Sequence, residues 1–200
     1  MRIQAKWIAF LCLFLASSVA GAADFANGLD ALDRGDYGTA LKEFKPLAEA
    51  GNARAQYRLG IMYAMGLGLA RDYRQAVNWL RKSATQGNAH AQDDLGVLYD
   101  FGRGVPADPK EASRWFRKAA EQGGGAAQFN LASLYEQGRG VPMDPVEAFA
   151  WADAATQFGE LRAQRLLDSI ARKMTPEQID QAQQRAKQYR QKYVVPFRTY

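Results

Sequence analysis

Small, apolar and aromatic side chains recur at a fixed interval of 36 residues through the middle of the chain. The clearest marker is an Ala-Gln pair, which occurs at Ala55-Gln56, Ala91-Gln92, Ala127-Gln128 and Ala163-Gln164. After each of the first three pairs, a leucine, a tyrosine, two glycines, an aspartate and a tryptophan follow at the same offsets. Such a period is typical of arrays of stacked helical units. We therefore divide residues 55–162 into three 36-residue units, 55–90, 91–126 and 127–162.

The first part of each unit predicts a helix followed by a tight loop. Ala55, Leu59 and Met62 share one face at helical spacing, and the helix is expected from about Ala55 to Met65. Small residues at one register, Gly60, Gly96 and Ala132, would let the neighbouring helix approach closely. The stretches 102–106 and 138–142 end the helix, because their glycines tolerate positive φ and their prolines cannot continue the hydrogen-bond ladder.

The second part of each unit predicts a helix that begins after an aspartate. Asp108 and Asp144 are each followed directly by proline and, three residues on, by glutamate, and Asp72 begins a proline-free version. This is the pattern of a helix N-cap. An inward stripe is expected at Ala76, Trp79, Leu80 and Ser83. The common register of Trp79, Trp115 and Trp151 indicates core residues, and carbohydrate stacking is the alternative.

Incomplete units are expected at both ends, in residues 23–54 and 163–200. Asp36, Tyr37 and Ala40 precede their counterparts in the first full unit by 36 residues. At the other end, Thr175 begins a last helix with one narrow apolar stripe and polar opposite faces. The stripe consists of Ile179, Ala182, Ala186, Tyr189 and Tyr193. A polar outer side is typical of the terminal cap of a repeat array.

The full pattern, Ala-Gln-x-x-Leu-Gly-x-x-Tyr-x-x-Gly-x-Gly-Val-x-x-Asp followed by Ala-x-x-Trp, resembles the Sel-one-like repeats, a branch of the tetratricopeptide-type helical repeats. The match is strongest at 102–108 and 138–144. The resemblance implies an all-α fold, a right-handed α-solenoid of antiparallel helix pairs whose first helices line a concave groove. It also implies an adaptor or scaffold that binds other proteins, often in a bacterial cell envelope, and it leaves the partner open.

The same resemblance places the variable positions of the first helices on the concave face. These positions are Tyr57, Ile61, Ala64, Asp93, Val97, Asp100, Phe129, Ser133 and Glu136. The acidic members favour a protein or peptide ligand with basic groups, and Tyr57 and Phe129 could anchor an apolar side chain. His90, the only histidine, is either a rim contact near Asp93 or a surface residue at a unit junction. The alternative for the whole face is a solvated surface without a ligand.

The first 22 residues have the pattern of a secretory signal peptide. Arg2 and Lys6 precede an apolar run at 7–16, and small residues lead to Ala22. We expect cleavage after Ala22 and a periplasmic or secreted protein. The alternative is an uncleaved anchor, although the run is shorter than the roughly 20 residues that a membrane span needs. The only cysteine, Cys12, lies in this run, so the exported chain would contain no thiol.

Basic charge is concentrated at the C-terminal end. Beyond Ala22 there are 24 basic and 21 acidic residues, and residues 172–200 hold seven basic and two acidic ones. This distribution does not favour nucleic acid as a partner. It supports a second hypothesis, an envelope-associated module that contacts peptidoglycan, polysaccharide or anionic lipid through Arg185, Lys187, Arg190 and Lys192. A solvated helix face is the alternative, and the aromatic tail at 193–200 could either pack back or dock a partner.

Catalytic motifs and cofactor fingerprints are missing from the sequence. It lacks Ser-x-x-Lys, Gly-x-Ser-x-Gly, His-Glu-x-x-His and the phosphate-binding Gly-Lys-Ser/Thr loop. The Gly-x-Gly-Val stretches are expected to join two helices, whereas a dinucleotide fingerprint follows a strand. We therefore expect no enzyme activity, no cofactor and no metal, and the sequence leaves the oligomeric state open.

Overall fold

The computed structural model describes residues 25–197, and all of its regular elements in that range are helices. Residues 25–33 are helical and precede α2. The remaining helices are α2 (Tyr37–Glu49), α3 (Ala53–Met65), α4 (Tyr73–Thr85), α5 (Ala89–Phe101), α6 (Pro109–Ala120), α7 (Gly125–Gln137), α8 (Pro145–Thr156), α9 (Leu161–Ala171), α10 (Pro176–Tyr193) and the short 3₁₀ helix η1 (Val195–Phe197). The predicted all-α solenoid of antiparallel pairs is confirmed.

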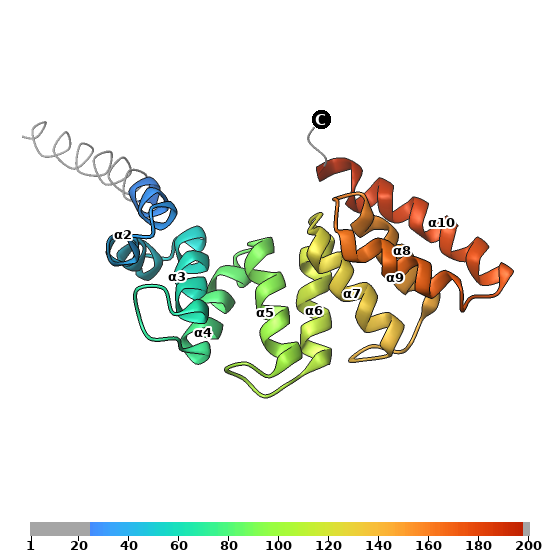
Figure 1. The fold of residues 1–200 in the computed structure, drawn as a ribbon, viewed down its shortest axis with the longest axis horizontal. Helices are drawn as coiled ribbons and strands as arrows, with labels where there is room; N and C mark the ends of the chain where they lie inside the picture. Colours follow the sequence, from blue (N-terminus) through green and yellow to red (C-terminus); the bar gives the residue numbers. More distant parts are fainter. Residues whose placement is uncertain (1–24, 198–200) are drawn as a thin grey trace, which may run out of the picture.

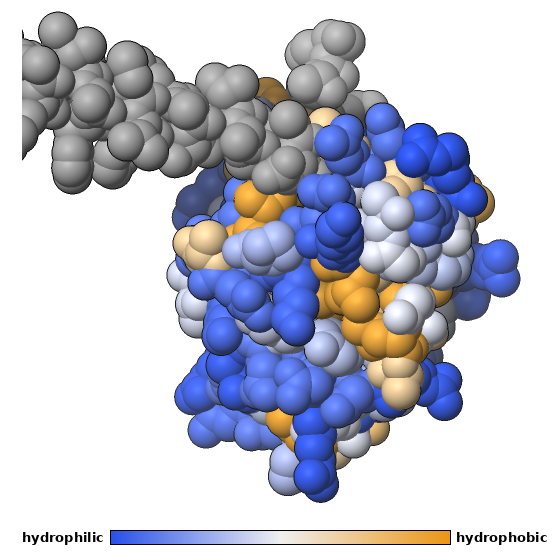
Figure 2. Space-filling view, turned by 90° about the vertical axis from the view of Figure 1, so that its left-hand side faces the viewer, coloured by the Kyte–Doolittle hydropathy of each residue, from blue (hydrophilic) through white to orange (hydrophobic). Residues whose placement is uncertain are grey.

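The pairs α3–α4, α5–α6 and α7–α8 follow one another along the long axis of the molecule, with α2 at one end and α10 at the other (Figure 1). The second helix of each pair also packs against the first helix of the next pair. The face at the α2 end is mostly hydrophilic and is crossed by smaller apolar areas (Figure 2). Up to α9 the array is therefore held together by contacts between neighbours in sequence, as expected for a repeat protein.

The predicted N-caps form at all three second helices. The Asp72 side chain accepts hydrogen bonds from the backbone N–H groups of Arg74 and Gln75, at 2.8 and 3.1 Å. Asp108 accepts one from Glu111, and Asp144 accepts two from the first turn of α8. Because these bonds satisfy N–H groups that have no partner within the helix, each cap fixes the residue at which the helix begins.

The second glycine of each loop is required by the contact between units. Gly104 has a φ of +76°, and a Cβ added there would lie 2.3 Å from the Tyr73 carbonyl oxygen of the preceding unit. Gly140 makes the same approach to Pro109, one unit later. The loop therefore lies directly against the start of the second helix in the unit before it, which explains why this glycine recurs at the 36-residue period.

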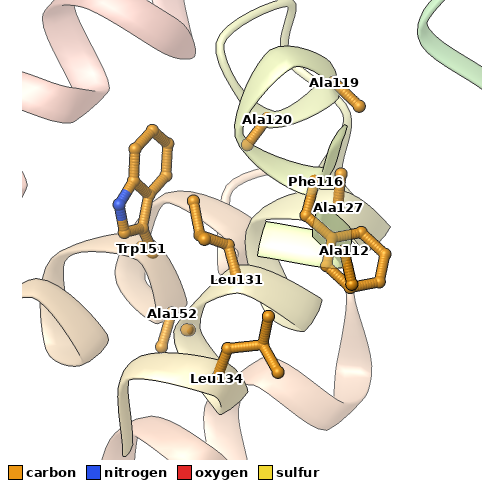
Figure 3. Close-up of a cluster of buried hydrophobic side chains, with 10 residues drawn as sticks. Ala112, Phe116, Ala119, Ala120, Ala127, Leu131, Leu134, Trp151 and Ala152 are labelled. Carbon is orange, nitrogen blue, oxygen red and sulfur yellow. The ribbon is translucent and has the colours of Figure 1, made fainter. Parts of the chain in front are cut away.

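The core consists of a layer of apolar side chains at each junction between helices. In the layer around α7, Leu131 lies between Trp151 of α8 and Phe116 of α6 (Figure 3). The predicted close approaches are present, because a Cβ on Gly96 would lie 2.6 Å from the Phe116 ring and one on Gly60 would lie 2.8 Å from Leu80. The core assignment of the tryptophans is confirmed for Trp151 and Trp115, which are 0% and 7% exposed.

Trp79 departs from that assignment, because it is only half-buried. One side of its ring packs against the apolar cluster of α2 and α3, and the Lys82 ammonium lies 4.1 Å from the ring centroid. No further helix covers this indole among the described residues. A repeated sequence position therefore does not guarantee equal burial.

The glutamine of the recurring Ala-Gln pair joins successive units. Gln56, Gln92 and Gln128 are buried, and their side-chain amides donate to the carbonyl oxygens of Ala48, Ala84 and Ala120 at 3.0–3.1 Å. The Oε1 atoms of Gln56 and Gln92 also accept from Gln86 and Gln122, both at 2.7 Å. In the third unit, Phe158 stands at the position of Gln86 and Gln122 and has no amide to donate. Gln128 Oε1 has no hydrogen-bond partner in the described structure.

The last helix, α10, packs against α8 and makes no comparable contact with α9 (Figure 1). We expected it to cover the end of the array. Asp168 of α9 explains the difference, because it occupies the register at which Gly60, Gly96 and Ala132 admit a second helix. A carboxylate at a close helix approach would lose its hydration, so α9 is left without a paired helix.

Candidate partner-binding groove

A hollow of about 490 Å³ lies between α5 and α7 on the first-helix side. Its lining is mixed, and the apolar part includes Val97 and Phe101 on α5 and Phe129 on α7. Asn130, Ser133 and Gln137 add polar groups from α7, and Arg139 and Arg162 reach it from the two segments that follow. A concave site of this size with a few polar groups is typical of a ligand pocket.

Five of the predicted site residues line this groove: Asp93, Val97, Asp100, Phe129 and Ser133. The others lie elsewhere. Tyr57 and Ile61 pack one unit earlier, beside the cluster that contains Leu95, and the Tyr57 ring centroid is 5.8 Å from that of His90. Glu136 forms an ion pair of 2.8 Å with Lys173. His90 is exposed at the unit junction, with its ring against Tyr57.

Asp93 is a half-buried carboxylate in the groove. Its Oδ1 accepts a hydrogen bond of 3.0 Å from the side-chain amide of Asn130. Burial raises the pKa of Asp93 to about 6, and the nearby charge of Asp94 acts in the same direction, while Asn130 opposes the shift. Close to neutral pH, Asp93 is thus a carboxylate with one protein partner and little surrounding water, and such a group gains from an additional hydrogen-bond donor.

The acidic bias that we predicted for this face is largely neutralised in the structure. Asp100 forms a 2.7 Å ion pair with Arg139, which belongs to the loop of the next unit. Glu136 is paired with Lys173 in the same way, one unit further on. The sequence prediction considered only the first helices, whereas both cations come from segments 37 to 39 residues downstream. Asp93 forms no ion pair among the described residues, and the nearby charge of Arg162 only partly offsets the effect of burial on its pKa.

The aromatic part of the groove differs at its two sides. The Arg162 guanidinium lies 4.4 Å from the Phe129 ring centroid and is held by a 2.7 Å ion pair with Glu160. Phe101 is 64% exposed. Sequence reasoning missed Asn130, Arg139 and Arg162 as groove residues. Asn130 could have been found from its position, because it is next to Phe129 and 37 residues after Asp93.

Two of the four basic residues proposed for envelope contact are engaged within the chain. Arg185 pairs with Glu147, and Arg190 pairs with Asp153, so both bind α10 to α8. Lys187 is exposed, and the Lys192 ammonium lies 4.9 Å from the Tyr193 ring centroid. The tail residue Phe197 packs at Gly123, where a Cβ would lie 2.7 Å from it. Residues 198–200 lie outside the described structure.

Within residues 25–197, no group of three or more His, Cys, Asp and Glu side chains is arranged to hold a metal ion. No helix of that range combines the length and apolar character of a membrane span. The predicted signal peptide and its cleavage site after Ala22 lie outside the described residues.

Stacked helix pairs with a groove on the first-helix side define the class of α-solenoid repeat proteins. Within that class, this chain belongs to the Sel1 repeat family, which matches residues 53–88, 89–124 and 125–157. The matches keep the predicted 36-residue period and begin two residues earlier than our divisions, at the first residue of α3, α5 and α7. Sel1 repeats generally mediate protein–protein interaction, and the family is one of non-catalytic scaffolds.

Solved structures that are similar to this chain include the following two. One is a Sel1 repeat protein from Oxalobacter formigenes, with 32% identity and a TM-score of 0.68 over 71% of this chain and 58% of that one. The other is a protective antigen of uropathogenic Escherichia coli with an SLR fold, with 31% identity and a TM-score of 0.63 over 88% of this chain and 46% of that one. The chain thus spans about half the length of these relatives. Among curated proteins, no sequence matches it.

Proposed function

We propose that this chain is an exported interaction module that binds a peptide segment of a partner protein in the groove between α5 and α7. The observation that carries the proposal is the half-buried Asp93 carboxylate in a groove whose lining combines apolar and polar side chains. A ligand that donates a hydrogen bond to Asp93 would replace water that the groove already limits. Charge-assisted hydrogen bonds of this kind are stronger than neutral ones.

The groove supports a particular peptide chemistry. Val97, Phe101 and Phe129 offer contacts to one large apolar or aromatic side chain, because they form the apolar part of its lining. Asp93 favours a lysine or arginine near that side chain. Asn130, Ser133 and Gln137 supply donors and acceptors for the peptide backbone. Buried aromatic anchors with a polar rim are the usual source of affinity in protein interfaces.

A selection from random displayed peptides on the full chain would test this specificity. We expect enrichment of peptides that combine an aromatic or large aliphatic residue with a basic one. Ser133→Trp should fill the groove and lower the affinity of a selected peptide by at least about tenfold, or about 1.4 kcal/mol. Gln183→Trp is the control, because Gln183 is exposed on α10, away from the groove, and should leave the affinity unchanged.

The electrostatic part of the proposal has its own control pair. Asp93→Asn should weaken the binding of a basic peptide by about 1 kcal/mol or more, because a neutral amide replaces the carboxylate. Asp180→Asn removes the same charge from the exposed side of α10 and should have no effect. Selected peptides that bind equally well to wild type, Ser133→Trp and Asp93→Asn would refute the groove as the binding site.

The exported location is the second part of the proposal, and residues 1–22 support it by their charge and apolar pattern. Cell fractionation with intact mass measurement would test it. We expect an extracytoplasmic protein whose first residue is Ala23, and a variant without 2–22 that stays in the cytoplasm. Recovery of the full-length chain from the cytoplasm alone would contradict export without affecting the groove proposal.

A further inference from the structure

The outer faces of α4 and α6 carry basic side chains at helical spacing. On α4 these are Arg74, Arg81 and Lys82, and on α6 they include Lys110, Arg114 and Lys118. Glu111 is the only acidic residue within the two helices, and it pairs with Arg114. Neither Lys82 nor Lys118 takes part in an ion pair within residues 25–197. This surface lies on the second helices and is therefore separate from the groove.

Each of these faces also contains a tryptophan beneath a lysine. The Lys82 ammonium lies 4.1 Å from the Trp79 ring centroid, and the Lys118 ammonium lies 4.3 Å from that of Trp115. The half-buried Trp79 borders a shallow, open hollow of about 480 Å³, whose lining residues in the described structure, among them Asn78, Arg81 and Lys82, all belong to α4. The hollow is large enough for a side chain, and an aromatic ring next to cations favours an aromatic ligand group with anionic neighbours.

In the third unit, the equivalent outer face, that of α8, is covered by another helix of the chain. There α10 lies on α8, with Tyr189 and Tyr193 ring centroids 4.4 and 5.2 Å from that of Trp151. Ala154 stands where α4 and α6 have Lys82 and Lys118, and Asp153 stands where they have Arg81 and Arg117. The ion pairs between the two helices join acidic residues of α8 to basic residues of α10. A helix with aromatic residues therefore fits this face when its charges are complementary.

From this comparison we infer that the outer face of α4 and α6 binds an acidic segment of a partner protein, whose aromatic side chain enters the hollow at Trp79. The outer faces of α4 and α6 are basic, whereas that of α8 is acidic. The segment that complements α4 and α6 should therefore be acidic at the positions where α10 offers basic residues to α8. An anionic membrane is a poorer fit, because none of the exposed large apolar residues in the described structure belongs to α4 or α6. A polyanion would match the charges but would leave the Trp79 hollow unused.

A fluorescein-labelled, glutamate-rich peptide with one central phenylalanine is a suitable probe, read by anisotropy against the full chain. A peptide with alanine in place of phenylalanine tests the hollow, and we expect it to bind at least about fivefold more weakly. The double variant Lys82→Glu with Lys118→Glu should raise the Kd for the phenylalanine peptide at least about tenfold. Arg165→Glu with Lys187→Glu makes the same change in net charge at exposed residues of α9 and α10 and should leave the Kd within about twofold.

Circular dichroism before and after heating would show that the variants are folded, and Lys82→Gln with Lys118→Gln replaces the reversed pair if that pair does not fold. Heparin and phosphatidylglycerol vesicles represent the other anionic partners. Equal binding of the phenylalanine and alanine peptides would overturn the inference, as would equal losses in the two double variants. Heparin or vesicles that bind through Lys82 and Lys118 more tightly than the phenylalanine peptide would also overturn it, in favour of a general polyanion surface.

Discussion

The second helices of the first two units and that of the third unit share a backbone register and differ in what covers them. The outer positions of α4 and α6 face solvent and hold Lys82 and Lys118, whereas the same position of α8 is Ala154, which is fully buried beneath α10. The amide series through Gln86 and Gln122 likewise stops at Phe158. The comparison teaches that residues matching the repeat determine the fold, and that departures from it reveal where an additional segment packs.

The largest expected effect is a difference in stability loss between alanine substitutions of Trp151 and Trp79. Trp151→Ala should lower the free energy of unfolding by about 4 kcal/mol, because it leaves a large cavity beneath Tyr189 and Tyr193. Trp79→Ala should cost only about 2 kcal/mol, since that indole is half-buried. Urea unfolding followed by circular dichroism measures both values. Equal losses for the two variants would mean that α10 adds nothing to the third unit.

A single exchange of the distinguishing residue should displace the covering helix. Ala154→Lys gives α8 the residue of α4 and α6, and we expect a loss of about 3 kcal/mol because an ammonium would be buried under α10 without a partner. Limited proteolysis should then cleave within α10 faster than in wild type. The reverse change, Lys118→Ala on the exposed face of α6, should alter stability by less than about 0.5 kcal/mol. Unchanged protease resistance in Ala154→Lys would contradict the position of α10.

Asp93 offers a prediction in which the substitution stabilises the fold. Its pKa of about 6 exceeds the ordinary value of 3.8, so the folded chain binds the extra proton between these pH values. Stability should therefore fall as the pH rises through that window, and the penalty should be complete above about pH 6. Asp93→Asn should stabilise the chain by about 1–2 kcal/mol at pH 7.5 and by almost nothing near pH 3.5. Thermal melts across this range measure the difference, and a constant difference at all pH values would rule out Asp93 as its source.

The smallest effect concerns the ion pairs between α8 and α10. Arg190 and Asp153 are partly exposed, with side chains 37% and 16% accessible, so solvent screens their attraction. We expect a coupling energy of about 0.5 kcal/mol from the cycle of Arg190→Gln and Asp153→Asn, decreasing at high salt. A coupling of several kcal/mol would show that charge, more than the aromatic cluster at Trp151, holds α10 in place.

Local signals made most of the fold predictable from the sequence. The period of 36 residues located the helix pairs, and Asp72, Asp108 and Asp144 gave the starts of the second helices because a cap bonds to residues only two or three positions away. The position of α10 was missed, although Ala154 and Asp168 both depart from the repeat. Their meaning depends on where α10 packs, and only the folded chain shows that it lies on α8.

The candidate site was predictable only in part for the same reason. Asp93, Val97 and Phe129 could be placed on one face from their register in the repeat. The ion pair of Asp100 with Arg139 could not, because the guanidinium reaches the groove from a loop whose side chains follow no helical period. The sequence therefore predicted the location of the groove better than its electrostatic character.

Hydrogen exchange of the full chain, measured with and without a peptide selected for binding, tests the groove most directly. Our account predicts that the peptide slows exchange mainly in α5 and α7, with little change in α4, α6 and α10. Protection confined to those three helices, with α5 and α7 unaffected, would contradict it.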